Sequence, residues 1–304
     1  MLLPFQLFTY TLELFIFCFM IPTNMFIFIV NLLNWIKVKK LLQVDQLITS
    51  ISACYILEEV IKSIRFIEKI CDNLLLLKIH FALSCMVMSC NVWFSTFLCV
   101  YFCLKIVNVK NTLYICLQRN FQKILPWLFV SAILGSVLVS LPFILNITKE
   151  DPSNIKLNTS AINRQSKFAL MNIKTKDILS YMTLSWIAML ILPISAFTIV
   201  TSLLKHINQV QQSFGGFRSP NMKAHVQALS TIISFLVTNV IILLVFSVNV
   251  IAHDEIWNYL IYPFYSLSKV VICWNLIKGN RNLKKTLKNI FSILHCTNTS
   301  NDVE

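Results

Sequence analysis

The chain has 304 residues, of which 57% are hydrophobic and only 13% are charged, and its formal net charge is +13. Soluble domains usually carry about 25% charged residues, so this composition excludes an ordinary soluble protein and favours a membrane protein. The chain has 4 glycines and contains neither GxGxxG nor GxxxxGK[ST], which excludes a phosphate-binding loop of either kind and argues against a β-barrel.

Hydropathy along the chain predicts seven membrane-spanning helices, since a helix of about 20 mostly apolar residues crosses a bilayer. Five predicted helices contain a long run without charged side chains, and they cover about 6–36, 78–104, 124–146, 178–204 and 226–252. Two weaker candidates, about 46–67 and 256–278, contain charged side chains. Counting both, we predict an all-α membrane protein, a seven-transmembrane helix bundle.

Lysine and arginine residues set the predicted orientation. They are more numerous in the loops that lie inside when the amino terminus is placed outside, as the positive-inside rule requires. In that position the positive charge faces anionic lipid, which removes nucleic acid as an expected partner. We therefore predict one seven-helix domain over residues 1–290, with the first helix retained, and a short cytoplasmic tail over residues 291–304.

Enzymatic and metal sites find no support in the sequence. The predicted spans contain no aspartate, HExxH is absent, and no cysteine and histidine residues have the spacing of metal ligands, so we expect no catalytic site, metal or cofactor. The outside loop 146–177 carries a glycosylation sequon at Asn158, far from the bilayer, and we expect the sugar there. A second sequon at Asn146 lies too close to the membrane.

Motifs at the inner helix ends resemble those of the bitter taste receptor family, the type 2 taste receptors. The family's patterns VN…W-hydrophobic-K with D-Q-I-L-T, WFATCLSVFYFLKIANF, SLxKHxxxM, KAHxxALKxxxSFL and GNxKLKQ all have counterparts here. The matching stretches are VNLLNWIKVKKLLQVDQLIT (30–49), WFSTFLCVYFCLKIVNV (93–109), SLLKHINQVQ (202–211), KAHVQALSTIISFL (223–236) and GNRNLKKTL (279–287). Their common order indicates a divergent member of this family of G protein-coupled receptors.

The resemblance implies a G-protein-coupling surface at the inner ends of helices three, five, six and seven. The residues that would line it are Lys105, Asn108, His206, Lys223 and His225. For the lysines, the alternative is that they only anchor the helix ends at the inner membrane surface.

Departures from the family pattern lie in helices two, three and seven, and the one in helix three is Met88, where the family has a pocket asparagine. Tyr55 stands where the family usually has arginine, Lys269 replaces a proline, and Ile272 and Cys273 replace a histidine-serine pair. Because a charge in hydrocarbon needs a partner or water, we hypothesise that Lys269 pairs with Glu58 or Glu59. The alternative is that the glutamates face the outer vestibule and Lys269 contacts water or backbone carbonyls.

The expected ligand pocket opens to the outside between helices three, five, six and seven. Successive spacings of three and four residues place side chains of helix three on one face, and those of helix seven likewise. Together with a glutamate that could select cationic ligands, the candidate ligand-binding residues are Phe81, Ser84, Met88, Glu59, Tyr259, Tyr262 and Ser266. Packing or interfacial anchoring is the alternative role for the aromatic members.

The resemblance implies a multi-pass plasma-membrane receptor for small bitter agonists, with a gustducin-like heterotrimeric G protein as its partner and no cofactor. Association with a second copy of the chain stays open. The nearest alternative is a vomeronasal type 1-like pheromone receptor, whose third helix ends differently from the LKIVN seen here. A transporter or channel subunit is the alternative from another class, and only helices two and seven offer the paired ionisable groups that it would need.

Overall fold

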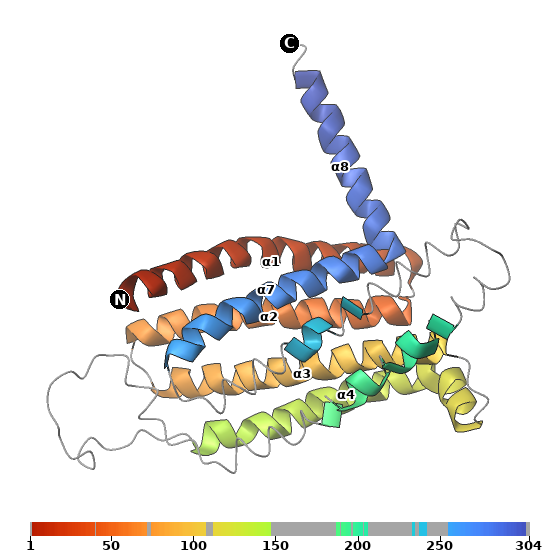
Figure 1. Cartoon of the computed structure of the whole chain (residues 1–304), viewed down its shortest axis with the longest axis horizontal. Coiled ribbons are helices and arrows are strands. Elements are labelled where there is room, and N and C mark those ends of the chain that lie inside the picture. The colour runs from red at the N-terminus through yellow and green to blue at the C-terminus, as the bar shows by residue number, and fades with distance from the viewer. Residues whose placement is uncertain are drawn as a thin grey trace, which may run out of the picture.

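The computed structural model describes a bundle of long helices. It describes residues 2–39, 41–71, 74–107, 112–146, 187–188, 190–195, 197–202, 204–205, 233–234, 237–241 and 255–301. The helices with full bounds are α1 (Leu2–Val38), α2 (Gln43–Cys71), α3 (Leu74–Ile106), α4 (Thr112–Asn146), α7 (Glu255–Gly279) and α8 (Arg281–Asn301). Five of them, α1 to α4 and α7, run lengthwise in the bundle, whereas α8 leaves it crosswise at one end (Figure 1).

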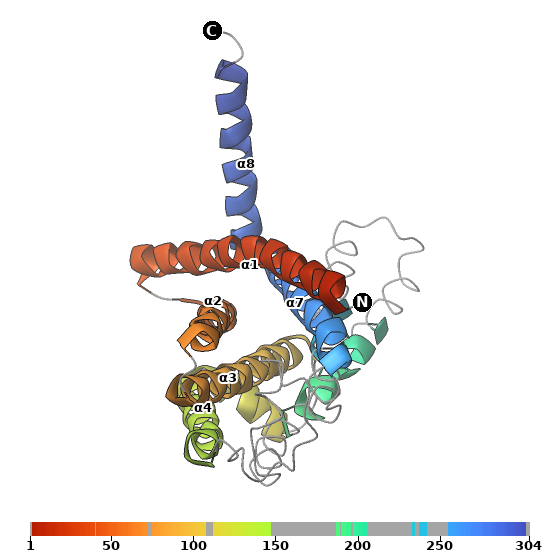
Figure 2. The same ribbon diagram turned by 90° about the vertical axis from the view of Figure 1, so that its left-hand side faces the viewer.

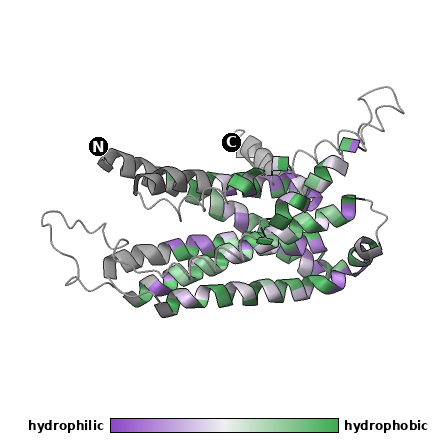
Figure 3. Ribbon diagram, turned by 60° about the horizontal axis from the view of Figure 1, so that its bottom comes forward, coloured by the Kyte–Doolittle hydropathy of each residue, from purple (hydrophilic) through white to green (hydrophobic). Residues whose placement is uncertain are grey.

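Within the described residues, three helices are long and apolar enough to cross a membrane, over Leu14–Val38, Lys78–Ile106 and Tyr114–Pro142. Figure 3 shows hydrophobic residues along most of the length of these helices. Large apolar side chains also point outward, and Trp127 is 75% exposed and Phe197 71% exposed. Exposure of this kind fits a surface solvated by lipid, because a soluble protein would leave the same apolar area in water.

Charged residues explain why α2 and α7 are less apolar than the other long helices. They are the two helices that we predicted as weaker spans, and each carries an ionisable group in its central part, Glu58 in α2 and Lys269 in α7. Both groups are buried in the bundle and not exposed to its surroundings. Two of the charged groups that lower the hydropathy of these helices therefore make their contacts inside the protein.

Packing proceeds in chain order for the first four helices. α1 packs on α2, α2 on α3 and α3 on α4, and α7 closes against α1. The core between them is made of branched and aromatic side chains, including Ile27 of α1, Ile51 of α2, Leu98 of α3 and Leu125 of α4. Each of these four side chains is no more than 1% exposed. The burial of their apolar surface and their close packing stabilise the contacts between the helices.

Short helical pieces lie within the predicted fifth and sixth helices. The pieces between 187 and 205 pack on α3, where the Thr96 hydroxyl donates to the Ala188 carbonyl (3.3 Å) and Ile199 is fully buried. The piece at 233–234 touches α7, where the Asn275 amide donates to the Ser234 hydroxyl (2.6 Å). The remainder of both predicted helices lies outside the described residues.

Helix ends differ from the predicted spans in a consistent way. α4 begins at Thr112, well before the predicted start at about 124, because the apolar stretch marks the membrane core and the helix continues beyond it through Arg119 and Lys123. At the other end of the chain, residues 291–301 of the predicted tail continue α8. Figure 2 shows α8 projecting from the end of α7, away from the other helices.

Candidate functional site

A row of buried polar side chains, which we call the polar seam, joins α7 to α1 and α2. Lys269, Cys273 and Asn280 are spaced by four and seven residues, which places them along one face of α7 and its carboxyl end. Their partners are Glu58, Asn24 and Asp45 in turn. The members of the polar seam are Asn24, Asn31, Asp45, Glu58, Lys269, Cys273 and Asn280, and each is at most 9% exposed.

The contact of the seam between Lys269 and Glu58 is an ion pair. The Lys269 ammonium group donates to a Glu58 carboxylate oxygen, and Lys269 is only 1% exposed. Lys269 also lies over the ring of the buried Tyr55, with Nζ at 5.9 Å from the ring centre. Our hypothesis of a pair across helices two and seven is confirmed, with Glu58 as the partner. Two opposite charges in a low-dielectric interior offset much of each other's desolvation.

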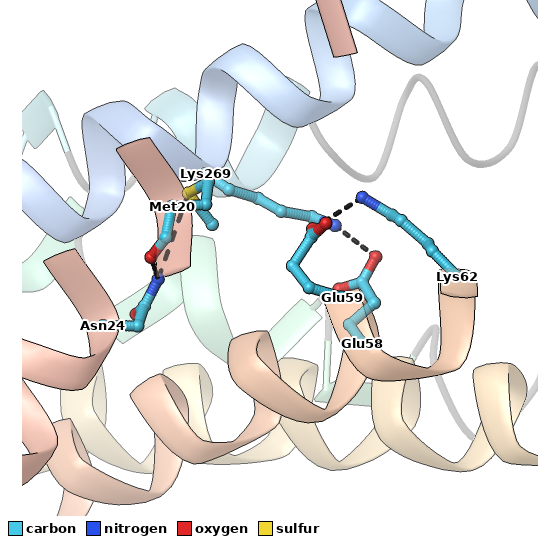
Figure 4. Close-up of polar contacts among 6 residues, drawn as sticks. All are labelled: Met20, Asn24, Glu58, Glu59, Lys62 and Lys269. Carbon is cyan, nitrogen blue, oxygen red and sulfur yellow. Dashed lines mark hydrogen bonds and ion pairs between the residues drawn. The ribbon is translucent and has the colours of Figure 1, made fainter. Parts of the chain in front are cut away.

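A second ion pair neutralises the neighbouring glutamate. Lys62 lies one turn along α2 from Glu59, and its ammonium group donates to the Glu59 carboxylate at 2.6 Å. Figure 4 shows Lys269 reaching from α7 toward the two glutamates, while Lys62 approaches from the other side. Among the described side chains, two acids and two lysines therefore form a cluster of zero formal charge, and Lys62 is its most exposed member.

The middle of the seam joins α1 to α7. The Asn24 amide donates to the Met20 carbonyl at 2.8 Å within α1, and the Cys273 thiol donates to the Asn24 side-chain oxygen at 3.3 Å. Figure 4 shows Asn24 turned back toward Met20. Asn24 thus contacts Cys273, a residue where this chain departs from the family pattern.

The predicted ligand-binding residues of α3 are half-buried. Phe81, Ser84 and Met88 lie on the outer part of the helix, the Ser84 hydroxyl donates to the His80 carbonyl (2.8 Å), and Met88 packs against the core. Ser266 of α7 is 3% exposed. α3 packs on α2 and α4 whereas α7 packs on α1, so the described helices do not by themselves join these two sets.

The remaining predicted site residues lie in α7, at the end of α3 or outside the described residues. Tyr259 and Tyr262 lie in α7, but their side chains are outside the described part of the chain. On the inner side, Lys105 is exposed at the end of α3, with Nζ at 5.7 Å from the centre of the Tyr101 ring. The other positions that lie outside the described residues are Asn108, Asn158, His206, Lys223 and His225.

Two contacts of the polar seam were not predicted. Cys273 was singled out in the sequence, and Asp45 and Asn280 lie within matched motifs, but neither contact joins two opposite charges, which was the signal that suggested a partner for Lys269. The property that could have indicated these contacts is the expected burial of Asn24, Asp45 and Asn280, because a buried asparagine or aspartate at a helix–helix contact needs a hydrogen-bond partner.

These features define an α-helical membrane bundle whose interior carries a polar seam, and comparison with known proteins gives its family. The family model Taste receptor protein (TAS2R) matches residues 1–295. The chain belongs to this family of bitter taste receptors, which are seven-helix membrane receptors and not enzymes.

Individual relatives agree with the family model. The chain is 27% identical over 232 residues to taste receptor type 2 member 2 of Homo sapiens, covering 71% of this chain and 72% of the relative. It is 27% identical to taste receptor type 2 member 7 of Papio hamadryas, covering 70% and 69%. It is 30% identical to taste receptor type 2 member 105 of Rattus norvegicus, covering 69% and 68%.

Proposed function

We propose that this chain is a plasma-membrane receptor, with its amino terminus outside, that binds a small bitter compound in the outer half of the bundle and activates a gustducin-like G protein. The observation that carries the proposal is the family match over residues 1–295. Binding would shift the balance between two arrangements of the helix bundle, and one of them would present the inner face to the G protein.

The ligand would sit above the polar seam. Lys269 lies ten residues before the end of α7 at Gly279, which is about 15 Å along the helix axis at 1.5 Å per residue. Ser266 lies one turn further outward, and Phe81, Ser84 and Met88 lie in the outer half of α3. The proposed pocket residues are these four, with Tyr259 and Tyr262 at the outer end of α7.

The ion pairs bear on the charge of the ligand. Glu59 was predicted to select cationic agonists, and its carboxylate is paired with Lys62. A cationic agonist would therefore compete with the Lys62 ammonium group for Glu59, whereas a neutral agonist would leave the pair intact. We propose that neutral, largely apolar compounds are the preferred agonists of the wild-type receptor.

The inner face would engage the G protein through Lys105, with Asn108, His206, Lys223 and His225 from the family motifs. Lys105 supports this assignment because its side chain is exposed where α3 ends. Its ammonium group is thus available to an acidic partner surface, and such pairs give orientation and a faster approach.

Calcium imaging tests the proposal. Cells would express the chain with a promiscuous gustducin-like G protein and would be exposed to a library of bitter compounds, with an amino-terminal tag stained on intact cells. We expect surface staining and a response to at least one compound. Staining without any response across the library would contradict the ligand class, and staining only after permeabilisation would contradict the orientation or the location.

A further inference from the structure

Asn280 occupies the junction between α7, which ends at Gly279, and α8, which begins at Arg281. Its backbone belongs to both helices, because its N–H donates to the Leu276 carbonyl (3.1 Å) and its carbonyl accepts from the Lys284 N–H (3.0 Å). The side chain is 8% exposed.

The Asn280 side chain makes contacts in two directions. Its oxygen accepts from the backbone N–H groups of Asn282 (3.0 Å) and Leu283 (3.3 Å), which is the N-cap arrangement at the start of a helix. Its NH₂ group donates to a carboxylate oxygen of Asp45 at 2.6 Å. One amide therefore caps α8 and binds α2 at the same time.

Asp45 is itself held in place. It lies in the first turn of α2 and is 6% exposed. Its backbone carbonyl accepts from the Thr49 hydroxyl at 2.5 Å, and the Asn31 amide of α1 donates to the Thr49 hydroxyl at 2.9 Å. The backbone at Asp45 is thus tied through Thr49 of the same helix to Asn31 of α1.

The rest of α8 has little to hold its direction. Leu283 is the one buried side chain among the described side chains of α8, and it lies in the first turn. Leu287, one turn further on, is partly buried against the same core, and beyond it the helix leaves the bundle crosswise in both perpendicular views (Figures 1 and 2). The direction of α8 relative to α2 is therefore decided in its first two turns.

We propose that Asn280 is a positioning residue that fixes the direction of α8 relative to α2 by capping α8 and donating to Asp45 with a single side chain. A hydrogen bond of ordinary strength to a charged group would favour this direction of α8 over other directions by roughly ten- to hundredfold. The further claim that this direction matters for signalling rests on the proposed function, since α8 presents Lys284, Lys285 and Lys288 at the inner face.

The two roles of Asn280 are separable by substitution. N280D keeps an oxygen that can cap α8 but replaces the donor with a second acid beside Asp45. The double variant D45N/N280D exchanges donor and acceptor, so it restores the contact without restoring the original residues. D45A removes the contact and leaves Asn280 unchanged. N282A is the matched control, since it alters an exposed asparagine in the same turn.

The test is a distance measurement by pulsed electron paramagnetic resonance on the full chain in lipid nanodiscs, without G protein. The labels would be attached through non-natural amino acids at the exposed positions Lys37 of α1 and Lys288 of α8, because the chain has 10 cysteines. We expect one narrow distance in wild type and N282A, its loss in N280D and D45A, and its return in D45N/N280D. If N280D cannot be purified, D45A carries the same expectation.

Three results would overturn the proposal: a broad distribution in wild type, an unchanged narrow distance in both N280D and D45A, or no return in the double variant. The second result would mean that Leu283 and the membrane surface set the direction of α8. The agonist response of the same variants is measured separately. Distances as expected with no response in wild type would leave the role of Asn280 standing and contradict the proposed function.

Discussion

The Lys269 ammonium group and the Glu58 carboxylate are 211 residues apart in the chain and form an ion pair between α7 and α2. Both side chains are buried, and each charge compensates the other, which would otherwise lie unpaired in the hydrocarbon region. Removing one partner of such a pair usually destabilises a protein by about 3–5 kcal/mol, whereas replacing both is tolerated far better.

Charge reversal should therefore behave as a matched set. E58K and K269E should each reduce surface expression strongly, and E58K/K269E should restore most of it, as measured by flow cytometry of an amino-terminal tag. K288E is the control, because it reverses an exposed lysine of α8 that lies outside this cluster. Failure of the double variant to recover, with K288E well expressed, would contradict the buried pair.

The Cys273 thiol should be replaceable only by another donor. C273S keeps a donor to the Asn24 oxygen, whereas C273V leaves that buried oxygen unpaired, at a cost of about 1–3 kcal/mol. Thermal unfolding of the purified receptor should show a lower midpoint for C273V than for C273S. C18V, at an exposed cysteine of α1, should match wild type. Equal midpoints for C273V and C273S would mean that the hydrogen bond contributes nothing.

Met88 should affect agonist potency without affecting expression. M88A removes a half-buried side chain from the proposed pocket on α3, and a lost contact of about 1.4 kcal/mol raises the effective concentration roughly tenfold. Dose–response curves from calcium imaging measure this. L138A, at a residue of α4 that is 65% exposed, is the control. Parallel shifts in both variants would point to a general loss of receptor and not to a pocket.

Asp45 should make stability depend on pH in a defined direction. Burial raises the pKa of the Asp45 carboxyl above its ordinary value of 3.8, and the Asn280 hydrogen bond opposes that rise. A raised pKa in the folded state gives stability that is fully present below 3.8 and is lost as the pH rises through the folded-state pKa. The difference in thermal unfolding midpoint, wild type minus D45N, should therefore decrease as the pH rises from 3.8 through the folded-state pKa of Asp45. A difference that grows with pH would contradict the burial effect.

Lys105 should be needed for signalling more than for folding. K105A should reduce the maximal agonist response roughly fivefold, equivalent to about 1 kcal/mol, at unchanged surface expression. K37A is the matched control, because Lys37 is also exposed at an inner helix end, that of α1, but is not among the predicted coupling residues. Responses normalised to surface staining decide the outcome. Equal losses in the two variants would assign Lys105 to anchoring as well.

Much of the architecture follows from the sequence because the membrane imposes a length and an apolar composition on each helix. The motifs then carry the family assignment, which the comparisons confirm. What hydropathy cannot give is the rotation of a helix about its axis. Glu58 and Glu59 are neighbours in the chain, but successive residues point about 100° apart on a helix, so only the packed structure selects Glu58 as the partner of Lys269.

The inner end of the bundle shows the same limit. Asp45 and Asn280 both lie in motifs that the sequence analysis matched, yet their contact joins positions 235 residues apart and depends on where α7 ends. The helical continuation to Asn301 was also not anticipated, since a short basic segment after the last apolar stretch gives no hydropathy signal.

The central claim is that an agonist bound in the outer half activates a G protein at the inner face. Nucleotide exchange on a purified gustducin-like heterotrimer, with the receptor in lipid vesicles, tests it most directly. With a bitter agonist identified in the screen, the account predicts exchange that is faster than without agonist and that declines in K105A. A receptor that binds the agonist but leaves the rate of exchange unchanged would contradict it.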